Sequence, residues 1–126
     1  MGQNMGYEVI NKTRNTVVAS QVRKADTYFK RLVGLMGKPV IPQGFGLWIV
    51  PCQDIHSFFM RVEFDAIFLN QEGQVLHLVQ RMKPWRISKF VRGGKVVLEL
   101  SAGTIEQSGT QPGDELALQA ISTEAF

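Results

Sequence analysis

Apolar and polar residues alternate along most of this chain, and the alternation predicts a protein built mainly of short strands. Seven runs show alternating or continuous apolar positions between turn residues. They lie at 7–11, 16–22, 45–50, 64–69, 75–82, 96–100 and 114–121. The run at 64–69 is apolar at nearly every position, which is typical of a strand in the middle of a sheet.

A helical period occurs once over a longer stretch. Phe29, Leu32, Val33 and Met36 follow one another at the spacing i, i+3, i+4 and i+7, with Asp26 as the expected N-cap. This pattern predicts one main helix between the second and third strands.

A second, short helix is expected at 102–109, where Thr104 and Gln107 have the spacing of a capping box. Strands and helices do not alternate in this order, so a doubly wound parallel sheet is not expected. The sequence predicts an α+β fold. Its mainly antiparallel strands would form a curled, barrel-like sheet with one main helix and one short helix.

The length of 126 residues and the hydrophobic fraction of 44% fit one domain with a core of its own. We expect a single compact domain at 7–122, a disordered or expression-derived segment at 1–6 and a C-terminal tail at 123–126. Cys52 is the only cysteine, so no intramolecular disulfide can form. No apolar run approaches the ~18 residues of a membrane span. No leader is visible, so the chain as written is expected in the cytoplasm, or in the cell envelope if a leader was removed.

The net charge of +3 is modest, but the charges are unevenly distributed. Between Gly73 and Leu98 there are six cations and no acid, whereas the rest of the chain carries eight cations and eleven acids. This asymmetry indicates an anionic ligand or partner.

Seven short motifs occur in a fixed order along nearly the whole chain. They are RLVGLMG at 31–37, PC at 51–52, IHSFFMR at 55–61, FDAIFL at 64–69, KPW at 83–85, VLELSAG at 97–103 and GD at 113–114. In this order the motifs resemble the domain-of-unknown-function family 192, a widespread prokaryotic family. The resemblance implies a small, strand-rich α+β domain, and it implies export for many relatives that carry a leader. It implies no reaction.

The segment from 55 to 65 is the most unusual part of the sequence. His56 and Met60 are expected to be neighbours, because they share a face in an extended strand and also in a helical turn. We therefore predict a non-catalytic binding or accessory domain with a small pocket near this segment. The candidate pocket residues are His56, Phe58, Met60, Arg61, Asp65, Trp85 and Arg86.

Two side chains of the same segment are of types that bind metals. An imidazole beside a thioether is a ligand pair for a soft metal such as Cu(I), but His56, Met60 and Cys52 make an incomplete set. The sequence therefore predicts no metal site and no cofactor.

A small hydrolase is the first alternative. Cys52 or Asp65 would act with His56 as the base, because a nearby imidazole lowers the pKa of a thiol. The competing interpretation of Cys52 is a buried and inert thiol.

Two acids fall within strands that are otherwise apolar, and a buried carboxylate needs a partner. For Asp65 and Glu99 we favour structural salt bridges over a role in lining a pocket. The expected partners of Asp65 are Arg61, Arg81, Arg86 and His56.

Binding of an anionic polymer or nucleic acid is the second alternative. The cations from Arg81 to Lys95 are interleaved with Trp85 and Phe90, as single-stranded nucleic-acid binders require. The competing interpretation is a solvated loop whose Trp85 plugs the core. Nucleic acid is the less favoured partner, because no RNA-binding module signature is present. The sequence predicts no oligomeric state.

Overall fold

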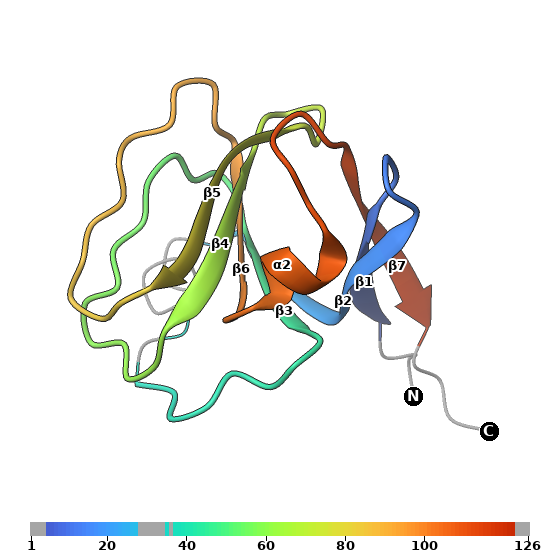
Figure 1. Ribbon diagram of the computed structural model, residues 1–126. Helices are drawn as coiled ribbons and strands as arrows, with labels where there is room; N and C mark the ends of the chain where they lie inside the picture. The colour runs from blue at the N-terminus through green and yellow to red at the C-terminus, as the bar shows by residue number, and fades with distance from the viewer. Residues whose placement is uncertain (1–4, 28–34, 36, 123–126) are drawn as a thin grey trace.

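The computed structural model describes residues 5–27, 35 and 37–122 (Figure 1). Seven strands and one short helix occur in this part of the chain. They are β1 (Met5–Asn11), β2 (Thr16–Ala25), β3 (Phe45–Ile49), β4 (Phe64–Leu69), β5 (Val75–Met82), β6 (Val96–Ser101), α2 (Thr104–Ser108) and β7 (Leu116–Ser122). Every predicted strand is present, and the predicted α+β fold class is confirmed. β1 begins at Met5, two residues before the predicted start.

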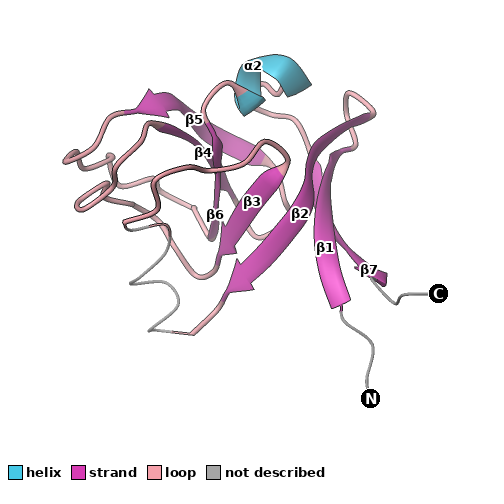
Figure 2. Cartoon of the chain, turned by 90° about the horizontal axis from the view of Figure 1, so that it is seen from below, coloured by secondary structure: helices cyan, strands magenta, loops and turns pink. Residues whose placement is uncertain are grey.

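All seven strands form one sheet in the order β5-β4-β6-β3-β2-β1-β7. Among the strands of the described residues, β2 and β3 alone pair in parallel, so the sheet is mixed but mainly antiparallel, as predicted. The sheet curls so that β4 and β5 stand on one side and β1 and β7 on the other, with α2 between them (Figures 1 and 2). An isolated bridge between Gln74 and Glu115 links one end of the two edges. Backbone hydrogen bonds there also join Val75 to Gly113 and Asp114, and Leu116 to Gly73. Within the described residues β5 and β7 form no ladder, so the predicted barrel-like sheet is not confirmed.

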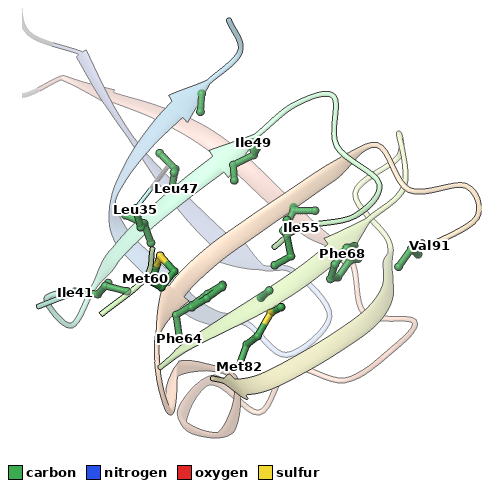
Figure 3. Packing of buried hydrophobic residues seen from close by; sticks show 13 residues of the cluster. Leu35, Ile41, Leu47, Ile49, Ile55, Met60, Phe64, Phe68, Met82 and Val91 are labelled. Carbon is green, nitrogen blue, oxygen red and sulfur yellow. The ribbon is translucent and has the colours of Figure 1, made fainter. Parts of the chain in front are cut away.

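The middle of the sheet is covered on both faces, which explains why its strands are apolar throughout. All residues of β4 and β6 are buried. The inner face packs with α2 through Ile105, whereas the outer face carries a second cluster that includes Leu35, Ile55 and Met60 (Figure 3). The chain therefore has two apolar layers, and the outer one is covered by loops.

The predicted main helix from Asp26 falls largely on residues outside the described ranges. β2 continues to Ala25, beyond the predicted strand end at 22. Leu35, the described residue within the predicted helical stretch, is buried in the outer cluster. Within the described ranges no helix is long and apolar enough to cross a membrane.

Candidate functional site

Two long loops lie side by side on the outer face, one between β3 and β4 and the other between β5 and β6 (Figure 1). Ser57 of the first loop is fully buried and joins the two. Its hydroxyl donates to the Lys83 carbonyl oxygen at 2.6 Å and accepts from the Arg86 amide at 2.7 Å. Its own backbone amide donates to the Arg86 carbonyl oxygen at 2.8 Å, and its carbonyl oxygen accepts from the Trp85 amide at 2.9 Å. One small polar residue, through its hydroxyl and its backbone, thus fixes the path of both loops.

The contact between the loops continues beyond Ser57 as a short antiparallel ladder. The Ser88 amide donates to the Ile55 carbonyl oxygen at 2.8 Å, and the Ile55 amide donates to the Ser88 hydroxyl at 2.9 Å. Between these bonds, His56 and Ile87 form an isolated β-bridge. Buried backbone groups of the loops are therefore paired as they would be in a sheet.

Four rings gather where the two loops meet, and we call His56, Phe58, Phe59 and Trp85 the aromatic cluster. The ring centroids of His56 and Phe58 are 4.8 Å apart, those of Phe58 and Trp85 5.6 Å, and those of Phe59 and Trp85 4.9 Å. Such separations are typical of attractive ring pairs. Phe59 and Trp85 remain 58% and 56% exposed, so the cluster is a surface rather than part of the core.

The backbone holds the two exposed rings in an uncommon conformation. Phe59 has a φ of 65° and Trp85 a φ of 62°, in the left-handed region that bulky residues rarely adopt. Each such residue costs of order 1–3 kcal/mol and persists only where its surroundings impose it. Here the Phe59 carbonyl oxygen accepts from the Gly37 amide at 2.9 Å, and the Trp85 amide is bound by Ser57. The strained conformation of these two residues therefore lowers the stability of the fold while it keeps two aromatic rings in solvent.

The structure divides the predicted pocket residues into two groups. His56, Phe58 and Trp85 lie together in the aromatic cluster. The Arg86 guanidinium lies beside them, with Nη1 3.4 Å from the Trp85 carbonyl oxygen. Arg61 is exposed on the loop that carries Phe59.

Met60 does not join this surface. It is buried in the outer cluster among Leu35 and Phe64 (Figure 3), so the expectation that it neighbours His56 on one face is wrong. The idea that Trp85 plugs the core is also wrong, since its side chain is mostly in solvent.

Asp65 is fully buried, but it does not form the predicted salt bridge. Its carboxylate accepts three backbone hydrogen bonds, from Arg81 at 2.9 Å, Gly103 at 3.1 Å and Ile105 at 2.9 Å. Asp65 thereby caps the N-terminus of α2. This helix begins after Gly103, which has no side chain to provide a cap of its own. The predicted capping box of Thr104 and Gln107 is therefore wrong, because a carboxylate from β4 occupies that role.

The thiol and the imidazole predicted as a catalytic pair make other contacts. Cys52 Sγ donates to the Asp54 carbonyl oxygen at 3.0 Å. His56 Nδ1 accepts from the Phe58 amide at 3.2 Å, so this nitrogen is occupied by the backbone of its own loop. The Asp65 carboxylate accepts from three backbone amides. No observation in the described residues favours the hydrolase alternative.

Glu99 is the unexpected acid of the structure. It lies in β6 opposite Leu47 of β3 and Ala66 of β4 and is only 6% exposed. No ion pair or hydrogen bond reaches its carboxyl group from the described residues, so the predicted salt bridge is wrong. Burial raises the pKa of Glu99 from 4.5 to about 8. The group is therefore protonated at neutral pH, because desolvation disfavours its charged form.

The other histidine belongs to β5. His77 packs against the Phe68 ring at 5.5 Å, and its pKa is lowered first by burial and then by the charge of Lys89. Within the described ranges, no three His, Cys, Asp or Glu side chains lie close enough together to hold a metal ion.

Several residues of this surface were missed from the sequence. Ser57 has no motif that reveals its role as a pin, and Phe59 was not among the predicted pocket residues. Ile87, which is 69% exposed on the second loop, was not predicted either. Phe90 of the same loop, 62% exposed, was named with the cations of the second alternative. The run of adjacent Phe58 and Phe59 was the one available signal, because only one of two consecutive side chains normally enters the core.

A family model and curated relatives assign the chain to the same family. The model of the family DUF192, described as an uncharacterised ACR, matches residues 9–118. A UPF0127 protein of Thermococcus sibiricus is 36% identical over 113 residues, covering 86% of this chain and 72% of the relative. A UPF0127 protein of Pyrococcus furiosus is 33% identical over 113 residues, covering 86% of this chain and 95% of the relative.

Two solved structures share the fold. A protein of unknown function from Novosphingobium aromaticivorans has a TM-score of 0.77 at 18% identity, over 89% of this chain and 83% of the other. A protein from Sinorhizobium meliloti, named as a proposed transcription regulator, has a TM-score of 0.77 at 21% identity, over 93% and 95% of the two chains. At these identities the likeness extends to the fold alone.

Proposed function

This chain belongs to the uncharacterised family DUF192, and we propose that it functions as a non-catalytic binding or accessory domain. Its ligand would contact the aromatic cluster, with Arg61 and Arg86 at the rim. The observation that supports this most strongly is the pair of exposed rings held at positive φ. Strained backbone that displays apolar side chains to solvent is a feature of ligand-contacting sites.

The hydrogen bonds between the two loops support the same role. Ser57 and the ladder around His56 hold the rings before any ligand arrives, so little conformational entropy would be lost on binding. A preorganised surface of rings suits a ligand with a flat or apolar face. The exposed cations of the second loop suit a ligand that is also anionic.

A thermal-shift screen of the whole chain tests the proposal. The panel holds nucleotides, sugars, acidic polymers and oligonucleotides, because a ligand at ~100 times its dissociation constant stabilises by about 2.7 kcal/mol. That stabilisation corresponds to a shift of several degrees for a domain of this size. The key variant is Trp85→Gly, since glycine adopts a φ of 62° readily while the ring is lost.

The matched control is Val17→Ala, which removes part of an exposed apolar side chain from β2. We expect a ligand that shifts the wild type and Val17→Ala but not Trp85→Gly. A ligand that shifts all three proteins equally would place binding elsewhere and contradict the proposal.

Binding of nucleic acid is a second candidate, supported by one observation. Lys83, Lys89 and Arg92 are exposed on the loop that carries Trp85 and Phe90. Phosphate contacts would make the affinity fall steeply with salt. An oligonucleotide titration at two salt concentrations decides this, and salt-insensitive binding or none at low salt would reject it.

A further inference from the structure

We infer that the surface formed by the aromatic cluster, by Ile87, which pairs with His56, and by the exposed Phe90 of the same loop docks an acidic polypeptide segment that carries apolar anchor residues. This inference rests on the proposed function and names the kind of partner. The partner's apolar side chains would pack against the rings, and its carboxylates would lie over the cations around them.

The apolar content of this surface is the first argument. Six large hydrophobic side chains are exposed in the described residues, and four of them belong to these two loops. The four are Phe59, Trp85, Ile87 and Phe90, with exposed fractions from 56% to 69%. Aromatic residues are enriched in the cores of protein–protein interfaces, and a concentration of exposed apolar side chains on a soluble domain marks an interaction site.

Charge complementarity is the second argument, and it indicates that the partner is negatively charged. Lys83, Arg86, Lys89 and Arg92 are all exposed on the same loop as Trp85. No acid occurs on this loop to neutralise them, and the first loop adds two exposed acids, Asp54 and Glu63, against the exposed Arg61, so cations remain in excess. Cations at the edge of an apolar patch attract carboxylates and speed association, whereas they repel a basic partner.

The arrangement of the rings favours a polypeptide over a nucleic acid. Trp85 already has Phe58 stacked on it at 5.6 Å and Phe59 tilted against it at 4.9 Å. A base that stacks on Trp85 would compete with these two rings. Ile87 has no flat face, so it contributes nothing to base stacking, but it packs well against an aliphatic anchor.

A peptide-display experiment tests the inference, because it selects binding sequences from a random pool. A library of random dodecapeptides is selected on the wild-type chain and counter-selected on a Phe90→Ala, Trp85→Gly double variant. Enriched peptides are then synthesised, and their dissociation constants are measured for the wild type, the double variant and a Lys89→Glu, Arg92→Glu variant. Val17→Ala serves as the control, and circular dichroism checks that every variant is folded.

We expect enriched peptides with an excess of Asp and Glu and at least one aromatic or large aliphatic residue. Their affinity should fall at least tenfold in both double variants and should be unchanged in Val17→Ala. Enrichment of basic or uncharged peptides, or no enrichment over the double variant, would overturn the inference. If a mixed-sequence single-stranded oligonucleotide loses affinity in the same variants and no acidic peptide binds, the partner class is wrong while the proposed binding surface stands. If neither a peptide nor an oligonucleotide binds the wild type more tightly than the variants, the proposed function itself is overturned.

Discussion

The Trp85 amide donates a 2.9 Å hydrogen bond to the Ser57 carbonyl oxygen, and this bond holds an exposed indole on a fully buried serine. The contact joins residues from two loops that are separated by two strands along the chain. It explains how Trp85 is kept at a φ of 62° with its ring in solvent. An exposed ring of the candidate site therefore depends on one of the most buried residues of the two loops.

Removing the Ser57 hydroxyl should loosen the site. Ser57→Ala leaves the Arg86 amide and the Lys83 carbonyl oxygen without their side-chain partner. An unsatisfied buried group costs about 1–3 kcal/mol, so we expect a loss of that size in the free energy of unfolding. Urea unfolding measures the loss. Trp fluorescence of the folded state should also shift, because the lost hydroxyl binds Lys83 and Arg86 on either side of Trp85. The exposed Ser20→Ala should be neutral, and equal stability of the two variants would show that Ser57 is not a pin.

The stability of the fold should depend on the carboxylate of Asp65 as a hydrogen-bond acceptor and not only on the size of its side chain. Asp65→Asn keeps the size of the side chain but turns an NH2 group toward backbone amides that need an acceptor. We expect a destabilisation of about 2–4 kcal/mol in urea unfolding, because hydrogen bonds to a charged acceptor are the stronger ones. Glu63→Gln, on the exposed residue two positions earlier, is the control and should change little. A neutral Asp65→Asn would contradict the capping role of Asp65.

Stability should fall as the pH rises because of Glu99. Its pKa is about 8 in the folded chain against 4.5 in the unfolded chain, so the unfolded state releases this proton first. The contribution of the protonated group is fully present below pH 4.5 and is lost as the pH rises to about 8. At about 1.4 kcal/mol per pKa unit the loss is on the order of 5 kcal/mol.

Glu99→Gln removes this titration. Unfolding curves of the wild type and of Glu99→Gln should diverge between pH 5 and pH 9, with the variant gaining relative to the wild type as the pH rises. Parallel pH profiles would show that Glu99 ionises without cost in the folded state.

Asp114 predicts the opposite dependence at acid pH. The side chain of Arg14 donates to its carboxylate from Nε at 2.9 Å, and Asn11 and the Gln111 amide donate as well. Together, and with Arg14 contributing most, they lower the pKa of Asp114 to about 2 from 3.8. The stability from this group is present above pH 3.8 and is lost as the pH falls through 2.

Asp114→Asn should therefore be less stable than the wild type by about 1–3 kcal/mol at pH 7 and nearly equal to it at pH 2. Thermal unfolding at both pH values measures this. The control is Glu115→Gln, which removes the exposed pair with Lys12 and should cost less than ~1 kcal/mol. An equal difference in stability between Asp114→Asn and the wild type at pH 2 and at pH 7 would contradict the stabilising role of the ionised Asp114.

The strands were predictable because their apolar period is a local property of the sequence. The stretch 64–69 shows this well, since its apolar residues on both faces follow from burial by two layers. The partner of Asp65 was not predictable, because its three amide donors come from the end of β5 and the start of α2, which are distant in the sequence. The absence of a partner for Glu99 among the described residues was not predictable either, because its neighbours Leu47 and Ala66 are also distant in the sequence.

The candidate site was predicted in part. His56, Phe58, Trp85 and Arg86 were recognised from their residue types, and the structure brings them together. Met60 was assigned to the wrong side, because the backbone turns at Phe59, where φ is 65°. A single left-handed residue changes the direction of every later side chain, and nothing in the local sequence marks Phe59 as such a residue.

The most direct test of the central claim is a nuclear magnetic resonance titration of the 15N-labelled chain with the first ligand or peptide that the screens identify. The account predicts that amide shifts concentrate at 55–60 and 83–91, with the indole N–H of Trp85 among the largest, and that Trp85→Gly abolishes them. Shifts concentrated around the hairpin of β1 and β2, or around Cys52 alone, would contradict the assignment of the aromatic cluster as the binding surface.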